Sequence, residues 1–386
     1  MGSKLSTQSH KNAILNQDNT TFCLHNERCE SNIKEGKTNY NIDLNPSHDQ
    51  LTECLHATKN QCYVQSDDTK GTIIGNHETQ ESESGEADLH TYLVNCKKNP
   101  GHKQFIPVDT FAMKHLPEGY QDKDLYEYIK VLSELTVRVS VLMSSPHRPM
   151  FWPKTTQPFP FYNMSDTRNL RTGSGSVWKV KKFHDGVRQD GCNGRTDYTK
   201  CWCRKCQDLD SPSNVWWEFK VTTAIQVVFD DIEASQTTLR LFYDRNDSLE
   251  VSVDKVKVDY VNIEYDLCML NCVTCDENLG NKLLETWKHF FDVSLKVSNK
   301  YFDNSFNQKL NVIVSHPHGC SKQVSVGQWK EKLEVGDLSK FTYTTCTCPG
   351  SSGAFVYCLG LNDVLSEIVH SGSLNSGLNY SGSGYI

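Results

Sequence analysis

The pattern of apolar and polar positions changes twice along the chain. Over residues 1–105, Asn, Gln, Ser, Thr and charged residues dominate, and the scattered apolar residues follow no helical or strand period. A segment of this kind cannot bury enough apolar surface to offset the conformational entropy that is lost on ordering. The sequence therefore predicts a disordered polar arm over residues 1–105.

A helical pattern follows, and a cluster of prolines comes after it. Apolar residues recur three or four positions apart within Leu125–Leu135, with acidic residues in the first turn, which predicts a helix over residues 122–135. The alternating valines of residues 137–141 fit either a longer helix or a strand. Five prolines within residues 146–160 interrupt regular structure. Residues 106–170 are therefore interpreted as a helical strap and a Pro-rich linker.

From residue 171 on, the chain is a series of short β-type runs separated by turns. Many short strands over ~200 residues are typical of a β-barrel or a β-sandwich, so residues 171–386 are predicted to form a mainly β domain. Thr286–Leu295 is interpreted as a helical insertion. The predicted β runs are Ser176–Phe183, Val215–Val228, Thr238–Tyr243, Leu249–Val253, Lys309–Ser315, Lys322–Val326, Gly353–Leu359 and Val364–His370.

Composition narrows the class of protein. The 386 residues include 40 basic and 47 acidic side chains, for a net charge of -7, which argues against nucleic acid as the main partner. No run approaches the roughly 18–20 apolar residues of a membrane span, and the start lacks the apolar core of a signal peptide. We therefore expect a cytoplasmic protein, in which the 16 cysteines are reduced thiols or metal ligands.

The first six residues, Met1–Ser6, fit the N-myristoylation pattern, with Gly2 as the acceptor after removal of the methionine. The alternative is an ordinary flexible start. One myristoyl chain binds membranes only weakly and reversibly, and no polybasic run or adjacent cysteine supplies a second signal. We therefore expect weak peripheral membrane association at most.

The run Cys348–Ala354 carries the first candidate chemistry. Glycines beside a serine let the backbone turn so that amide N–H groups point at a carbonyl under attack, although Ser/Gly clusters also occur in plain turns. The run resembles the Gly-Asp-Ser-Gly-Gly loop of the trypsin-like (chymotrypsin-fold) serine proteases. The resemblance implies a two-barrel fold, Ser352 as nucleophile, and the N–H groups of Gly350 and Ser352 as the oxyanion hole.

Two further segments extend the resemblance over roughly residues 171–386. Asp266, which opens an apolar strand, is similar to the buried Asp of the family, although an Asp in this place is also a common turn residue. The run Val221–Val228 is similar to the strand end that normally reads Thr-Ala-Ala-His, and Gln226 stands in the histidine's place. A glutamine amide cannot accept a proton near neutral pH, so it cannot act as general base toward Ser352.

No other histidine in the sequence is an evident substitute base. His289 is followed by carboxylates that lie too close to Ser352 for this fold, and the run Ser315–Gly319 reads as a turn at a strand end. The resemblance places His370 on the strand that lines the substrate cleft, where some family members read an acidic or amide side chain. The alternative for His370 is a strand histidine with satisfied hydrogen bonds. Cys346 corresponds to the base of the specificity pocket and would not select basic side chains.

Two groups of cysteines are candidates for metal binding. Cys192, Cys201, Cys203 and Cys206 lie within fifteen residues and could close a tetrahedral Zn²⁺ site. A second group comprises Cys268, Cys272, Cys275 and Cys320. The alternative is a set of reduced cysteines, so zinc is a possible structural component and no cofactor is required for the predicted function.

Together these observations predict a trypsin-like serine peptidase homologue whose general base is replaced, and hence a pseudoprotease that binds peptide or protein segments in its cleft. Two alternatives remain open. One is an active intracellular serine endopeptidase that uses Ser352 with an unrecognised base. The other is a lipid-tethered adaptor in which the barrel is only a scaffold.

Overall fold

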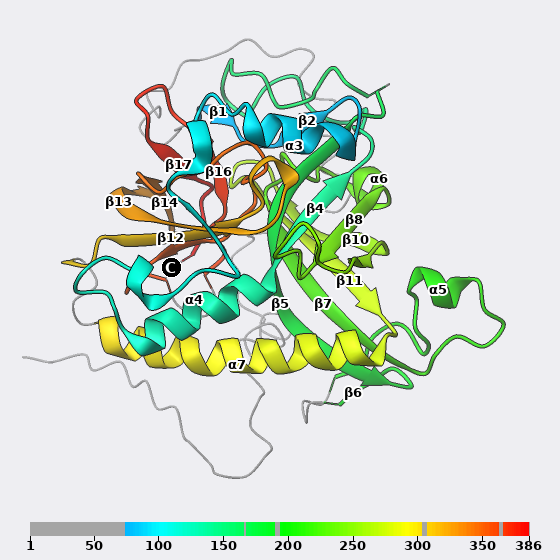
Figure 1. Cartoon of the computed structure of the whole chain (residues 1–386). Helices are drawn as coiled ribbons and strands as arrows, with labels where there is room; N and C mark the ends of the chain where they lie inside the picture. Colours follow the sequence, from blue (N-terminus) through cyan, green and yellow to red (C-terminus); the bar gives the residue numbers. More distant parts are fainter. Residues whose placement is uncertain (1–73, 166, 190–193, 303–306, 363–365, 386) are drawn as a thin grey trace, which may run out of the picture.

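The computed structural model describes residues 74–386 except residues 166, 190–193, 303–306, 363–365 and 386. Within the described residues, two antiparallel sheets of nine and eight strands form the body of the molecule, and two long helices lie along one side of it (Figure 1). This architecture confirms the mainly β fold predicted from the sequence. None of the described helices is long and apolar enough to cross a membrane.

The nine-stranded sheet contains the strands that carry Gln226 and Asp266 at their ends. Its main order is β10-β11-β7-β5-β4-β8-β9, and both β2 and β6 pair with β5. The strands are β2 (Gln80–Ser82), β4 (Thr136–Val141), β5 (Leu170–His184), β6 (Val187–Arg188), β7 (Val215–Thr223), β8 (Thr237–Leu241), β9 (Val251–Val253), β10 (Val256–Asn262) and β11 (Leu267–Thr274).

The eight-stranded sheet contains the strands on either side of Ser352. Its main order is β1-β16-β17-β14-β13-β12-β15, and β3 pairs with β13. The strands are β1 (Asn76–His77), β3 (Phe105–Pro107), β12 (Leu310–Ser315), β13 (Gln323–Val335), β14 (Leu338–Tyr343), β15 (Val356–Cys358), β16 (His370–Ser373) and β17 (Asn379–Ser381).

Two amphipathic helices cover the two sheets on one side. In α4 (Lys123–Leu135), the Asp122 side chain caps the first turn by accepting from the Leu125 N–H at 3.0 Å. The insertion predicted around residue 290 is the long helix α7 (Glu277–Tyr301), which lies beside α4 (Figure 1). The shorter helices are α3 (Glu86–Val94), α5 (Arg204–Gln207), α6 (Asp231–Ala234) and the 3-10 turns η2 (Pro100–His102), η3 (Met113–His115) and η5 (Pro317–Gly319).

One large apolar core joins the inner faces of both sheets to α4 and α7. Because this core includes residues 108–141, the region predicted as a strap and linker belongs to the domain. The valines of residues 137–141 lie in strand β4, which pairs with β5 on one side and β8 on the other. Their alternation places them on one face of the sheet. The last predicted strand, Val364–His370, was placed too early in the sequence, because the observed strand β16 begins at His370.

The predicted disordered arm was too long. Residues 1–73 lie outside the described residues, but residues 74–105 are described, and they include β1, β2 and α3, of which β1 and β2 pair with strands of the domain. The order of this polar segment comes from hydrogen bonds to strands that are distant in sequence, and not from an apolar core of its own. Composition alone therefore could not reveal it.

Candidate active site

The candidate nucleophile Ser352 lies in the loop that joins β14 to β15. Gly350 has a φ of +97°, and a Cβ atom there would lie 2.4 Å from the carbonyl oxygen of His316, so only glycine fits this turn. The turn directs the backbone N–H groups of Gly350 and Ser352 at one oxygen, the carbonyl oxygen of Glu78, at 2.6 Å and 3.2 Å. Two convergent N–H donors are the geometry of an oxyanion hole.

Gln226 lies between Asp266 and the strand that carries Ser371. Its Nε2 donates to Asp266 Oδ2 and to the Ser371 carbonyl oxygen, both at 2.8 Å, and the Ser352 Oγ donates to the same carbonyl oxygen at 3.0 Å. Among the described residues, however, no hydrogen bond joins Gln226 to Ser352, and Gln226 Oε1 is buried without a partner.

Asp266 is fully buried immediately before β11 and accepts a hydrogen bond from the Ser371 Oγ at 2.5 Å. Burial raises the pKa of its carboxyl group to about 6, although the hydrogen bonds from Ser371 and Gln226 act in the opposite direction. The position behind residue 226 is the one from which a carboxylate orients an imidazole in the trypsin-like machinery. Here it orients an amide that cannot accept a proton near neutral pH.

A buried ion-pair network holds the loop of Gln226 in place. The Arg148 Nη2 donates to the Gln226 carbonyl oxygen at 3.1 Å, and Arg148 also binds both carboxylate oxygens of Glu233, at 2.7 Å and 2.8 Å. Arg171 lies 3.0 Å from the same carboxylate. Burial acts to raise the pKa of Glu233, but the two arginines outweigh it and lower the pKa. The network therefore fixes residue 226 with charged groups that have no contact with solvent.

The cleft between the sheets is filled by residues 76–82 of the same chain. On one side of Glu78, β1 pairs antiparallel with β16, with Asn76 opposite Ser373. On the other side, β2 pairs antiparallel with β5. The Glu78 N–H donates to the Ser352 Oγ at 3.1 Å. The segment is thus extended across the site, with the carbonyl group of Glu78 beside the nucleophile.

The Glu78 side chain lies in a buried pocket of its own. His370 Nε2 is 2.8 Å from Glu78 Oε2, and the Tyr343 hydroxyl is 2.6 Å from His370 Nδ1. Lys98 forms an ion pair with the other carboxylate oxygen and also donates to Asn379 Oδ1 at 2.8 Å. The carboxylate is therefore held from both sides by donors.

Electrostatics in this pocket favour an ionised carboxylate. Burial acts to raise the pKa of Glu78, but the hydrogen bond from His370 and the charge of Lys98 outweigh it and lower the pKa to about 2. Burial also lowers the pKa of His370, although its hydrogen bond to Glu78 acts in the opposite direction. The Tyr343 hydroxyl donates its proton to the Tyr380 carbonyl oxygen at 3.1 Å, and a proton on His370 Nε2 would be donated to Glu78.

The other predicted residues near the cleft have different partners. Cys346 is half-buried and donates to the side chain of Gln104. His289 lies on the surface, 2.9 Å from Glu127. His316 is buried, with Nδ1 2.9 Å from the carbonyl oxygen of Cys320. Within the described residues, neither histidine is hydrogen-bonded to Ser352, so the structure supplies no substitute base there. Gly2 lies outside the described residues.

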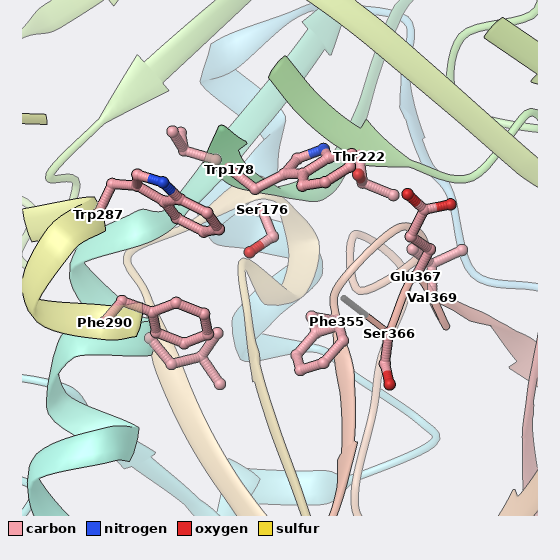
Figure 2. A pocket seen from close by; sticks show the side chains of 11 residues that line it. Ser176, Trp178, Thr222, Trp287, Phe290, Phe355, Ser366, Glu367 and Val369 are labelled. Carbon is pink, nitrogen blue, oxygen red and sulfur yellow. The ribbon is translucent and has the colours of Figure 1, made fainter. Parts of the chain in front are cut away.

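A separate apolar pocket of about 40 Å³ lies between α7 and the sheets, and Figure 2 shows Trp178, Trp287, Phe290 and Phe355 around it. Glu367 is the only ionisable residue of its lining. None of the candidate catalytic residues lines it, and its volume holds only a few waters. The candidate catalytic residues therefore lie apart from this pocket.

Three of the four cysteines predicted as zinc ligands meet in the structure. Cys201, Cys203 and Cys206 are joined by Cys275, which directly follows β11, and the four sulfur atoms all lie within 4.8 Å of one another. The Sγ atoms of Cys203 and Cys275 are 3.5 Å apart. The fourth predicted ligand, Cys192, lies outside the described residues.

The second cysteine group predicted from the sequence is not assembled. Cys268 and Cys272 lie four residues apart on β11, so they share the face that points into the main core. Cys320 packs against Leu89 in a small separate cluster. Of that group, only Cys275 joins a cluster of possible ligands in the described part of the chain.

No family model matches the sequence, and no curated protein does. Among solved structures, the chain is similar to the HtrA-type protease AlgW with tripeptide, at 11% identity and a TM-score of 0.34, over 66% of this chain and 58% of that chain. It is also similar to Deg5, at 11% identity and a TM-score of 0.33, over 69% and 90%. The chain thus spans less than two thirds of the AlgW chain. Likenesses this low leave the question of function to the site itself.

Proposed function

We propose that this protein is a trypsin-like serine peptidase homologue that has lost its general base and uses its cleft to hold a peptide segment in substrate geometry. One observation carries the proposal. The carbonyl oxygen of Glu78 accepts hydrogen bonds from the N–H groups of both Gly350 and Ser352, while the flanking residues add strands to both sheets. Strand addition with a side chain in a pocket is a general mode of peptide recognition.

The replaced base supports the loss of turnover. Ser352 donates its proton to a backbone oxygen, and the side chain at position 226 is an amide that is itself a donor to Asp266. In a serine protease, loss of the base alone lowers turnover by on the order of 10⁶. An occupied oxyanion hole without a base is suited to binding and not to cleavage.

The pocket supports a preference for an acidic side chain. Glu78 is 2% exposed and its carboxylate is held by His370 and Lys98. A buried carboxylate is tolerated only when it is paired and hydrogen-bonded. A leucine or a lysine at position 78 would leave these donors unsatisfied, which costs about 1–3 kcal/mol for each buried polar group.

Because the occupant belongs to the same chain, other peptides compete with it at a disadvantage. A segment tethered by a short linker acts at an effective concentration of about millimolar. We propose that an external ligand of the cleft is an extended peptide or protein segment with a glutamate that takes the place of Glu78, and that it binds well only when residues 76–82 are displaced.

The test uses a fluorescent peptide that copies residues 74–84, with anisotropy as the readout. Full-length wild type should bind it weakly, and Glu78→Lys, which expels the segment by placing a cation beside Lys98, should bind it at least tenfold more tightly. Glu83→Lys is the matched control, because Glu83 is exposed, and it should behave like the wild type. Equal weak binding by all three folded proteins would contradict peptide binding in this cleft.

The rival proposal, an active endopeptidase with another base, is tested with a fluorophosphonate probe on Glu78→Lys, in which the segment no longer covers Ser352. Fast stoichiometric labelling of Ser352 would contradict loss of the base.

We also propose that Cys201, Cys203, Cys206 and Cys275 hold a structural Zn²⁺, because a Cys₄ set satisfies its tetrahedral geometry.

A further inference from the structure

Four metal-binding side chains meet beside the oxyanion loop, away from the Cys₄ group. They are Cys96, His102, His318 and Cys348, and one ligand atom from each lies within 4.8 Å of all the others. The two sulfur atoms are 3.6 Å apart, and Cys348 Sγ is 3.5 Å from His102 Nε2. The four residues come from the segment before β3, the turn after β12 and the loop of Ser352.

These distances match the edges of a tetrahedral zinc site. With Zn–S bonds of ~2.3 Å and Zn–N bonds of ~2.0–2.1 Å, tetrahedral angles give ~3.8 Å between two sulfurs and ~3.6 Å between a sulfur and a nitrogen. Hydrogen bonding between thiols could also bring Cys96 and Cys348 to 3.6 Å. It would not explain why two imidazoles share the same space.

The polar atoms around the cluster are arranged as they are around metal ligands. His318 is 3% exposed, and its Nε2 is buried with no hydrogen-bond partner in the described residues, while its Nδ1 lies 2.9 Å from Gln80 Oε1. A ligating histidine commonly donates its other ring N–H to an oxygen in this way. Asn99 donates its backbone N–H to Cys96 Sγ at 3.4 Å and its side-chain amide to Cys348 Sγ at 3.1 Å, and such donors would stabilise the negative charge of metal-bound sulfurs.

The backbone supports the same interpretation. His102 and His318 have φ values of +47° and +55°, in the left-handed region that is unusual for residues other than glycine. Such conformations cost of order 1–3 kcal/mol each and persist where the surroundings hold them. These histidines are two of the eight non-glycine residues with positive φ in the described part of the chain, and a shared metal ion would hold both.

We propose that Cys96, His102, His318 and Cys348 form a Cys₂His₂ site for Zn²⁺ that fastens the cleft-filling segment to the oxyanion loop. Four protein ligands leave no open position for water or substrate, so the site is structural and not catalytic. This proposal does not depend on the proposed function, because it concerns metal content.

The placement of the site gives the metal a role in the cleft. Lys98, the partner of Glu78, lies between Cys96 and His102 along the chain. Cys348 lies two residues before Gly350, one of the two oxyanion donors. A metal bound by these residues would hold Lys98 beside Glu78 and the loop of Gly350 beside the carbonyl group of Glu78. Removal of the metal should therefore release residues 74–105 from the domain.

The test measures zinc per full-length chain by plasma mass spectrometry after dialysis. The double variant Cys96→Ala/His102→Ala should hold about one equivalent less than the wild type. Cys346→Ala is the matched control, because Cys346 is a neighbouring thiol outside the cluster, and it should lose none. In a Cys203→Ala/Cys206→Ala background, Co²⁺ should give thiolate charge-transfer and tetrahedral d–d bands that disappear with Cys96→Ala/His102→Ala.

Two results would overturn the proposal. One is equal zinc in the wild type and in Cys96→Ala/His102→Ala, and the other is a Cys96–Cys348 disulfide, found by mass spectrometry, in metal-free folded protein. If the double variant does not fold, His102→Cys decides the question, since a third thiolate must retain the metal and intensify the Co²⁺ charge-transfer band. An unchanged band would overturn the proposal. Loss of zinc without any change in peptide binding would support the metal site and count only against its link to the cleft.

Discussion

Restoring the missing base should turn the cleft segment into a substrate. In Gln226→His, an imidazole would take the place of the amide whose Nε2 lies 2.8 Å from Asp266 Oδ2, so Asp266 would hold the tautomer that accepts the Ser352 proton. The carbonyl group of Glu78 already lies in the oxyanion hole, with the Ser352 Oγ 3.1 Å from the same residue's N–H. We therefore predict cleavage of the chain between Glu78 and Thr79.

The expected magnitude is large. The residual activity of a serine protease without its base is about 10³–10⁴ over water, and the base contributes on the order of 10⁶ in turnover. That factor corresponds to about 8 kcal/mol of barrier, at 1.36 kcal/mol for each tenfold change. Because attack on Glu78 occurs within one chain, no association step limits it. Even a partly restored base should be visible within hours, whereas the wild type should remain intact.

The assay is intact-protein mass spectrometry with chemical labelling of new N-termini. Gln226→His should yield two fragments, one ending at Glu78 and one beginning at Thr79. Adding Ser352→Ala should prevent cleavage, which excludes a contaminating protease. A folded Gln226→His protein that stays whole, and whose Ser352 does not react with a fluorophosphonate after Glu78→Lys is added, would refute the assignment of position 226 to the base.

Four further predictions test other parts of the molecule. Burial raises the pKa of Asp266 from 3.8 to about 6, so the folded protein binds this proton more tightly than the unfolded chain does. The free energy of unfolding should therefore be highest below pH ~4 and should decline as the pH rises through about 6. Asp266→Asn should remove this decline of about 3 kcal/mol in urea unfolding, and equal pH profiles would contradict it. Glu233→Gln should lower the free energy of unfolding by about 3–5 kcal/mol, because it leaves buried arginines unpaired; a loss below ~1 kcal/mol would argue against the network. Cys203→Ala/Cys206→Ala should lose about one zinc equivalent, and unchanged zinc would exclude the Cys₄ site. A myristate analogue should label the wild type but not Gly2→Ala, and equal labelling would exclude the lipid.

The sequence predicted those parts of the fold and site that depend on local patterns. The caps and apolar spacing of α4 lie within fifteen residues, and so does the Gly-flanked loop of Ser352. Resemblance then placed Asp266 and Gln226 in order along the chain, and the structure brings both together with Ser352. A strand end or a glycine turn depends mainly on residues that are adjacent in sequence, so it can be recognised without knowledge of the rest of the fold.

What the sequence could not predict depends on pairing between distant segments. Glu78 lies in a polar run with no apolar period, and only the donors of His370 and Lys98 explain its burial. Cys275 joins the cluster of Cys201, Cys203 and Cys206 because the pairing of Thr274 with Trp217 places the end of β11 near the cysteines that precede β7. Cys275 directly follows β11, and β11 pairs with β7, the strand that comes after Cys201, Cys203 and Cys206. A sequence-based prediction of this strand pairing would have pointed to Cys275 as the fourth cysteine.

In the proposed function, the replaced base and the filled cleft would explain each other. A segment whose carbonyl group lies in a working oxyanion hole beside a competent nucleophile would be cut, so residues 76–82 can remain as a permanent occupant only if the chemistry is absent. Conversely, once Gln226 has removed the base, Asp266 and Gly350 still serve to hold Glu78 in place, through the loop of Gln226 and the oxyanion donors. Under this proposal the site would serve as a binding site, and its first ligand would be the chain itself.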